Sequence, residues 1–418
     1  MPWARIIGGV VGMRVLHILG QRPDMTGSGM FLRNIWRFGS EAGDRLHLLC
    51  AGYEDDDFAG FFGEDLSTVR CGEAGGCEYA DLIPGMSDVM PYRSRRYADL
   101  SIREALDYVD AFGARLAGIV AVFAPDVIHV HHLWLLAGLV ERVDVPVVVT
   151  VHGTGLQQAR LAPHLLELFA DALPKVARFM AVSEDVARDT CSLYALSPKR
   201  VVVVANGFDE EVFFPPAESV EGSEGPAVVA AGKYVEWKGH DHLIRALAHE
   251  DLLTAELTIL GTGPESRRAA LLDVAERAGV GERLSLPGHV EAGEVAETFR
   301  RASAFALPSL HEPFGLVLLE ALACGCPVVA SATAGPKLIV DPALIEAGLA
   351  ALVEPPADSS ELERRRYETG LAEALGRVLD RGANASERRE IASSVRGLTW
   401  RATYQEMQRL YKQEVPPC

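Results

Sequence analysis

Residues 307–327 of the chain read LPSLHEPFGLVLLEALACGCP, and the expected fold follows from this stretch. The run Phe305 to Pro308 is typical of the end of a buried strand. The residues that follow predict a helix over about 314–324, because a proline precedes it and a Gly-Cys-Pro sequence ends it. This helix is apolar on every side except at Glu320, which indicates that it is buried.

The start of this predicted helix offers a site for an anion. The N–H groups of Phe314 to Val317 have no partners within the helix, and the helix dipole places partial positive charge there. Glu312 lies in the loop just before, and Glu320 lies two turns deeper, where a buried carboxylate must find hydrogen-bond donors or lose its charge. A phosphate at the helix start, with a ribose diol lying along the helix, would use all three groups.

The run EPFGLVLLEALACG from Glu312 to Gly325 resembles the E-x7-E motif of retaining GT-B glycosyltransferases of the family-4 type. The resemblance implies that Glu312 holds hydroxyls of the donor sugar and that Glu320 holds the ribose hydroxyls. The donor diphosphate would be held at the helix start, by Phe314, Gly315, Leu316 and Val317. A buried helix with a stray acid is the alternative, which the length and tight spacing of the motif disfavour.

The same resemblance implies an α/β protein of the GT-B class, with two Rossmann-like domains that face an inter-domain cleft. The expected boundaries are 1–215 for an acceptor-side domain, 216–395 for a nucleotide-sugar-binding domain and 396–418 for a C-terminal helix that crosses back to the first domain. A length of 418 residues agrees with two domains.

The composition, 49% hydrophobic and 23% charged, is that of a globular protein. No run approaches the roughly 18 apolar residues of a transmembrane helix. The net charge of −18 provides no basic excess for nucleic acid or for an anionic membrane surface. Seven scattered cysteines without CxxC spacing favour a reducing cytoplasm. Residues 1–12 lack the features of a signal peptide.

Only six of the 40 basic residues are lysines, and two of them, Lys233 and Lys238, are five residues apart beside glycines. Two cations there would neutralise a diphosphate as charge builds on the leaving group. The segment resembles the Gly-Arg-x-x-x-x-Lys-Gly pattern of the same family, with Lys233 where arginine is usual. The charge is kept, but the bidentate geometry of arginine is lost. Two exposed loop lysines are the alternative.

Two histidines fall just beyond predicted strands, where ligands bind in doubly wound sheets. His132 follows the strand 126–131, and His152 follows the strand 145–150. The resemblance favours His152 as a catalytic residue that touches the donor sugar, and His132 is a candidate for the acceptor. No third ligand lies at a convincing spacing for a metal. We therefore expect no metal and no cofactor beyond the nucleoside diphosphate sugar, which is a co-substrate.

Three further segments are assigned to the donor by the resemblance alone. Gly29 lies in a Gly-rich loop after the strand 15–19, and its backbone would lie over the donor phosphate, although the loop does not match the GxGxxG fingerprint. A flexible surface turn fits this loop as well. Asn206 belongs to an Asn-Gly-x-Asp sequence at the end of the first domain. The base would be bordered by the turn Gly288, His289 and Val290.

The long loop 84–97 is rich in arginine and tyrosine, and long loops in compact domains are often functional. Arg93 and Arg95 are therefore candidates for binding an acidic group of the acceptor. An exposed loop whose arginines pair with nearby acids fits the same pattern, and the sequence leaves both interpretations open.

These features predict a retaining glycosyltransferase that moves a sugar from a nucleoside diphosphate sugar to a small soluble acceptor, in natural-product or low-molecular-weight thiol metabolism. A lipid- or polysaccharide-type acceptor of the cell envelope is the first alternative. A phosphorylase, an epimerase and a non-catalytic nucleotide-sugar-binding protein are the others. The sequence names neither the sugar, the base nor the acceptor.

Overall fold

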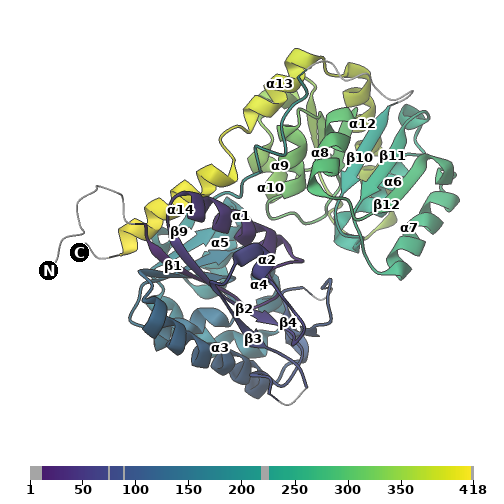
Figure 1. The fold of residues 1–418 in the computed structure, drawn as a ribbon. Coiled ribbons are helices and arrows are strands. Elements are labelled where there is room, and N and C mark those ends of the chain that lie inside the picture. Colours follow the sequence, from purple (N-terminus) through teal and green to yellow (C-terminus); the bar gives the residue numbers. More distant parts are fainter. Residues whose placement is uncertain (1–11, 74–75, 88–89, 218–225, 416–418) are drawn as a thin grey trace. The chain divides into compact units, whose positions relative to one another are not determined.

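The computed structural model describes residues 12–73, 76–87, 90–217 and 226–415, which form two compact α/β units (Figure 1). The first unit comprises Met1–Val204 together with Thr403–Cys418, and the second comprises Ala205–Ala402. The N-terminal stretch, for which the sequence predicts no signal peptide, lies outside the described residues apart from Gly12.

The first unit is built on a seven-stranded parallel sheet in the order β3-β2-β1-β6-β7-β8-β9. Its central strands are largely buried, as parallel sheets covered by helices require, whereas the edge strands β3 and β9 are only partly buried. The strands are β1 (Arg14–Leu19), β2 (Arg45–Gly52), β3 (Leu66–Arg70), β6 (Val127–His131), β7 (Val147–Val151), β8 (Arg178–Ala181) and β9 (Val201–Val203). A separate small ladder joins β4 (Pro84–Gly85) to β5 (Arg95–Arg96).

Helices cover both faces of this sheet. They are α1 (Gly27–Glu41), α2 (Ala59–Phe62), α3 (Ile102–Phe123), α4 (Thr154–Leu161), α5 (Glu184–Tyr194) and the end of α14 (Trp400–Glu414), with 3-10 segments at Tyr97–Asp99, Leu136–Arg142, Pro163–Lys175 and Pro198–Arg200. Helix α3 follows Ser101. It begins there because Ser101 and Glu104 form a reciprocal capping box, and it ends at Ala124 in the left-handed region.

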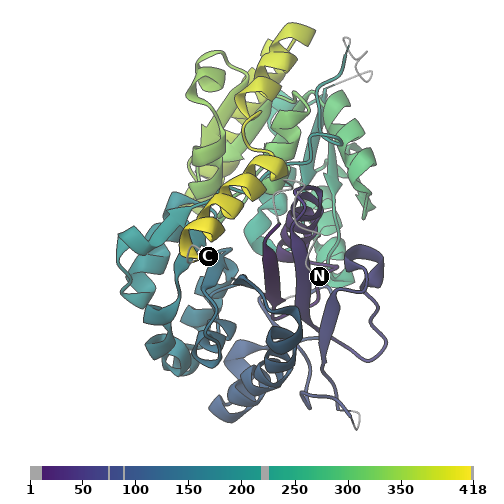
Figure 2. The same cartoon turned by 60° about the vertical axis from the view of Figure 1, so that its left-hand side comes forward.

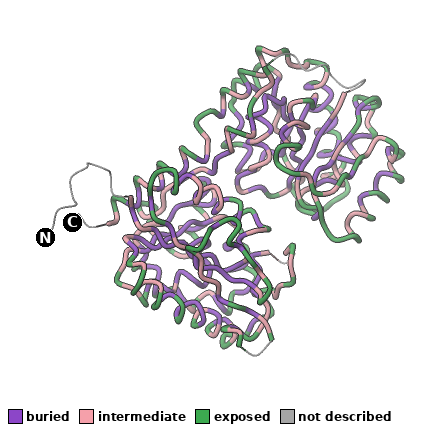
Figure 3. Tube along the Cα trace, in the orientation of Figure 1, coloured by how far each residue is buried: buried purple, intermediate pink, exposed green. Residues whose placement is uncertain are grey.

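The second unit carries a six-stranded parallel sheet in the order β12-β11-β10-β13-β14-β15. The strands are β10 (Ala227–Ala231), β11 (Glu256–Leu260), β12 (Leu284–Gly288), β13 (Ala304–Leu307), β14 (Val328–Ser331) and β15 (Ala350–Val353). The central strands β10, β13 and β14 are almost entirely buried (Figure 3), whereas the edge strand β12 is mostly of intermediate exposure or exposed. The strand order reverses between β10 and β13, and the carboxyl ends of such strands are where doubly wound sheets bind ligands.

Helices α6, α7 and α12 pack together over one face of this second sheet, while α8, α9 and α13 pack together over the other (Figure 1). The helices of the unit are α6 (His240–Ala246), α7 (Glu265–Arg277), α8 (Ala292–Arg301), α9 (Leu316–Ala323), α10 (Ala334–Ile339), α11 (Pro342–Glu346), α12 (Glu361–Arg381) and α13 (Ala385–Ser394), with 3-10 segments at Glu236–Lys238, Glu250–Leu252 and Gly281–Arg283. The sequence predicts α9, from the apolar run that follows Pro313, but it does not predict α13, which begins at a capping box on Asn384.

The end of α14 returns to the first unit (Figure 2). Tyr404 Oη donates to the Asp44 carboxylate at 2.5 Å, and Tyr411 Oη lies 2.7 Å from Nδ1 of His129 on β6. An ion pair of 2.6 Å joins Arg178 to Glu414. The predicted crossing of the C-terminal helix and the two Rossmann-like sheets are therefore confirmed. None of the described helices has both the length and the apolar character needed to cross a membrane.

Candidate active site

The second unit places the predicted anion site at the start of α9. Gly315 takes a φ of +98°, which favours glycine, and α9 begins only at Leu316, two residues later than predicted. As at the start of any α-helix, the first N–H groups of α9 have no partners within the helix. The segment Phe314 to Val317 therefore has the arrangement that suits a phosphate.

Glu312 and Lys238 meet beside this helix start. Lys238 Nζ lies 2.6 Å from Glu312 Oε2, and the two side chains are only 19% and 11% exposed. Ser309 Oγ also donates to Glu312 Oε2, at 3.2 Å. The shielding from water strengthens the attraction between the ammonium and the carboxylate. The structure thus brings together two residues that the sequence assigned separately to the diphosphate and to the sugar.

The backbone explains why these two side chains meet. Lys238 follows β10 and Glu312 follows β13, the two strands at which the order of the sheet reverses. Leu310 N donates to Trp237 O at 2.8 Å, which joins the two loops. Gly239 has a φ of +66°, and a Cβ atom there would lie 2.1 Å from Pro308 O, so only glycine permits this approach.

Lys233 is exposed and has no carboxylate partner among the described residues. Desolvation and, secondarily, the charge of Lys238 lower the pKa of its ammonium group. A second cation beside an already paired one leaves net positive charge near the start of α9. An anionic ligand would supply the partner that Lys233 lacks.

Glu320 lies on α9 and is half-buried, and its carboxyl group has no hydrogen-bond or ion-pair partner within the described part of the chain. Burial raises the pKa of Glu320 to about 8. The sequence predicts that this acid finds donors or loses its charge, and without a ligand the second outcome holds at neutral pH. Hydroxyl groups of a ribose would be suitable donors to its ionised form.

The remaining donor-side candidates form no contact among the described residues that tests their predicted roles. Gly288 ends β12 with a φ of +91°, and its carbonyl accepts from Gly261 N at 2.9 Å. His289 is exposed beside Glu291, at 3.3 Å. Asn206 is buried, and its Oδ1 atom lacks a hydrogen-bond partner. The predicted roles of these residues and of Val290 in donor binding stay predictions.

In the first unit, His132 and His152 follow β6 and β7, as predicted, and their ring centroids are 4.8 Å apart. His132 Nδ1 and His152 Nε2 have no hydrogen-bond partners. Burial lowers the pKa of His132 to about 3 and lowers the pKa of His152 well below its ordinary value. Both rings are therefore neutral, able to exchange hydrogen bonds with hydroxyl groups but not to carry charge.

Sequence reasoning missed Gln21, which directly follows β1. Its Nε2 atom donates to Thr26 Oγ1 at 3.1 Å and to Ser28 Oγ, and it lies 3.5 Å from His132 Nε2. The order of the first sheet reverses between β1 and β6. The strand-end rule that selects His132 would therefore have selected Gln21 as well. Gly29 is packed tightly against this loop, since a Cβ atom there would lie 2.2 Å from Pro23 O.

A second feature missed from the sequence is a buried cluster of His17, His129 and His131, whose ring nitrogens lie within 4.8 Å of one another. His17 Nδ1 faces His131 Nε2 at 3.1 Å. Both nitrogens of His129 are engaged, by Thr150 Oγ1 and by Tyr411 Oη, each at 2.7 Å. His17 Nε2 and His131 Nδ1 have no hydrogen-bond partner among the described residues. Burial lowers the pKa of all three rings, so they form a neutral network that Tyr411 joins to α14.

The arginines proposed for the acceptor differ from each other. Arg95 forms ion pairs with Asp81 and with Glu104, the latter at 2.8 Å. Its charge is therefore already neutralised, which corresponds to the second interpretation of this loop. Arg93 is exposed, and Tyr53 Oη donates to its backbone carbonyl. A role for either residue in acceptor binding stays a prediction.

Two family models match the chain, one for each half. The model for Glycosyltransferase Family 4 matches residues 25–212, and the model for Glycosyl transferases group 1 matches residues 215–365. The second match includes Lys233, Lys238, Glu312 and Glu320.

Several curated proteins are similar in sequence. A D-inositol 3-phosphate glycosyltransferase of Xylanimonas cellulosilytica is 32% identical over 51% of this chain, which spans 57% of that relative's length. D-inositol 3-phosphate glycosyltransferase 1 of Catenulispora acidiphila is 31% identical over 61% of this chain and 71% of its own. The chain thus spans little more than half of the first relative and over two thirds of the second.

Among solved structures, a sucrose-phosphate synthase from Thermosynechococcus elongatus superposes with a TM-score of 0.70. The superposition covers 96% of this chain and 98% of that one, at 20% sequence identity. At this level of identity the likeness bears on the fold, and it covers both units.

Proposed function

The chain belongs to the family-4, group 1 glycosyltransferases, and from this premise we propose that it is a retaining enzyme that moves a sugar from a nucleoside diphosphate sugar to a small soluble acceptor. The observation that carries the proposal is the 2.6 Å contact between Lys238 and Glu312 beside the start of α9. It supports a site in which a cation for a diphosphate and a carboxylate for a sugar are neighbours.

In this proposal the chain acts by positioning and by stabilising charge. The start of α9 and the ammonium groups of Lys233 and Lys238 hold the diphosphate and stabilise the negative charge that develops as it departs. Glu312 accepts hydrogen bonds from the sugar hydroxyls, and Glu320 accepts them from the ribose. His152, a neutral imidazole, is the residue of the first unit that we assign to the sugar.

The proposed reaction breaks the bond between the anomeric carbon and the diphosphate oxygen and forms a bond from the acceptor oxygen to the same face of that carbon. The acceptor proton passes to the departing phosphate oxygen, so no protein nucleophile is needed. The residues proposed for the site include cations for the phosphates, and we assign no metal to the reaction.

The names of the relatives suggest a class of acceptor. Two of them are called D-inositol 3-phosphate glycosyltransferases, so a small hydroxylated metabolite such as a cyclitol phosphate is the first acceptor to test. None of the contacts described favours a lipid or polysaccharide acceptor over this class.

The proposal is tested by incubating the chain with a panel of nucleoside diphosphate sugars and cyclitol phosphates. We expect release of one nucleoside diphosphate only when its acceptor is present, and an unchanged anomeric configuration in the product by NMR. Inverted product would contradict the retaining assignment. Turnover that requires inorganic phosphate instead of an acceptor hydroxyl would identify a phosphorylase.

A further inference from the structure

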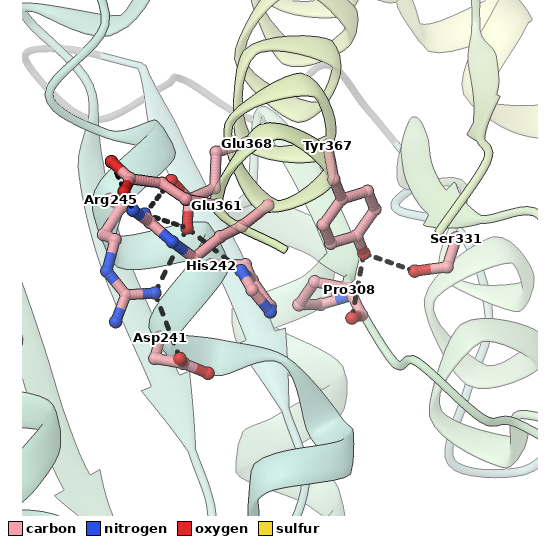
Figure 4. A network of polar contacts seen from close by, with 9 residues as sticks. Asp241, His242, Arg245, Pro308, Ser331, Glu361, Tyr367 and Glu368 are labelled. Atoms are coloured by element: carbon pink, nitrogen blue, oxygen red, sulfur yellow. Dashed lines mark hydrogen bonds and ion pairs between the residues drawn. The ribbon is translucent and has the colours of Figure 1, made fainter. Parts of the chain in front are cut away.

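Tyr367 lies on α12, and its hydroxyl reaches the turn that carries Glu312. Tyr367 Oη donates to the carbonyl of Pro308 at 2.9 Å and lies 2.5 Å from Ser331 Oγ, and the side chains of both hydroxyl residues are fully buried (Figure 4). A tyrosine hydroxyl has a single proton, and a carbonyl can only accept. With the Tyr367 proton directed at Pro308, the hydrogen bond between the two hydroxyls takes its proton from Ser331, whose Oγ also lies 3.4 Å from the Leu307 carbonyl oxygen.

The carbonyl of Pro308 occupies a central place in the candidate active site. It is the atom against which Gly239 packs, directly after Lys238. Ser309, which follows it, donates to Glu312. A shift of this carbonyl would therefore move the lysine-bearing loop and the carboxylate-bearing turn relative to each other.

Glu368, the residue after Tyr367 on α12, contacts helix α6. The Glu368 carboxylate accepts hydrogen bonds from His242 Nδ1 at 3.0 Å and from Arg245 Nη1 at 3.1 Å, both on α6 (Figure 4). Helix α6 begins immediately after Gly239. Two adjacent residues of α12 thus contact the helix that follows Lys238 and the turn that precedes Glu312.

We propose that Tyr367 is a positioning residue for the Lys238–Glu312 pair, an inference that rests on the glycosyl transfer proposed above. Tyr367 does not touch substrate; its hydroxyl, supported by Ser331, fixes the Pro308 carbonyl and thereby the separation of the ammonium from the carboxylate. A small misplacement of groups at a reacting centre lowers the reaction rate more than it weakens ligand binding. The nucleoside diphosphate is also held by the start of α9 and by Lys233, so its binding depends less on this hydroxyl than the rate does.

The test is Tyr367→Phe, which removes the hydroxyl and keeps the ring. We expect kcat to fall by about tenfold, while the Kd of the free nucleoside diphosphate stays within about twofold of the wild type. Ser331→Ala should lower kcat in the same direction by a smaller factor. The double variant should lose no more than Tyr367→Phe alone, because both changes remove the same support.

Tyr404→Phe is the matched control, since it removes another buried tyrosine hydroxyl, one that donates to Asp44 in the first unit. It should lower the melting temperature and leave kcat unchanged. If Tyr367→Phe also loses only melting temperature, or if Tyr404→Phe loses as much kcat, the positioning role is refuted. A wild-type chain that turns over no donor and binds no nucleoside diphosphate contradicts the proposed function itself, and this result is seen before any variant is made.

Discussion

Lys238 Nζ lies 2.6 Å from Glu312 Oε2, across 74 residues of sequence. In the absence of a donor the two charges neutralise each other, so that Lys233 is left as the unpaired cation of the pair of lysines. When a nucleoside diphosphate sugar binds, its diphosphate would contact Lys238 and its sugar would contact Glu312. These contacts would replace the ion pair between the two side chains. The predictions below follow from this arrangement.

Lys238→Ala should reduce turnover by roughly a hundredfold or more, because it removes a cation next to the developing charge of the leaving group. The fold should be kept, which circular dichroism checks. Lys337→Ala is the matched control, since Lys337 pairs with Glu354 on an exposed surface at 3.4 Å. Wild-type rates in Lys238→Ala would overturn the assignment of the diphosphate site.

Lys233→Ala should weaken binding of the nucleoside diphosphate by about tenfold, the scale of one charge-assisted contact, measured by calorimetry. Lys233→Arg should restore binding, since it keeps the charge and adds a second donor. The effect of Lys233→Ala should shrink at high salt, because the exposed ammonium is screened. Equal affinities for all three proteins would show that Lys233 does not contact the phosphates.

Glu320 predicts a pH dependence of stability. Its pKa is raised to about 8 in the fold, so between about pH 4.5 and pH 8 the folded chain binds a proton that the unfolded chain has lost. The free energy of unfolding should therefore fall with rising pH in this window, by at most about 1.4 kcal/mol per pH unit from this group. Denaturation of Glu320→Gln at pH 5, 7 and 9 should give a flatter profile than the wild type. Superimposable profiles would show that the acid is ionised in the empty site.

The histidine cluster predicts that the free energy of unfolding rises with pH in the acid range. Burial lowers the pKa of His17 to about 3, and the pKa values of His129 and His131 lie well below their ordinary value. Their contribution to stability is complete above about pH 6.5 and is lost as pH falls, because the unfolded chain then binds protons that the folded chain excludes. His17→Gln should reduce this acid-side slope, and His289→Gln, at an exposed position, should not. Equal slopes in the two variants would contradict the buried, neutral network.

Chelators should leave both turnover and melting temperature unchanged, because the charges proposed for the reaction belong to lysines and a helix start, and because four ring nitrogens of the histidine cluster are engaged in hydrogen bonds. The measurement is a rate assay and a thermal melt with and without EDTA. Loss of turnover that a divalent cation restores would refute the metal-free mechanism. A fall in melting temperature alone would identify the histidine cluster as a metal site.

The sequence predicts an element boundary well where residues adjacent in the chain determine that boundary. The capping box of Ser101 and Glu104 sets the start of α3, and it is visible in four residues of sequence. The start of α9 was placed two residues too early, because a proline before an apolar run suggests an early start while the left-handed Gly315 delays it. The positive φ of Gly315 depends on the residues packed around it.

The sequence by itself determined the pieces of the site: the acids Glu312 and Glu320 on one segment, the lysines Lys233 and Lys238 on another, and the strand-end histidines. Spacing within a segment is fixed by covalent geometry, so these assignments needed no coordinates. Only the tertiary structure decided that Lys238 pairs with Glu312, that Glu320 has no partner among the described residues, and that Tyr367 donates to the carbonyl of Pro308 in the turn before Glu312. Such contacts join residues far apart in the chain, and their distances depend on how the strands are ordered in the sheet and on which helix packs over it.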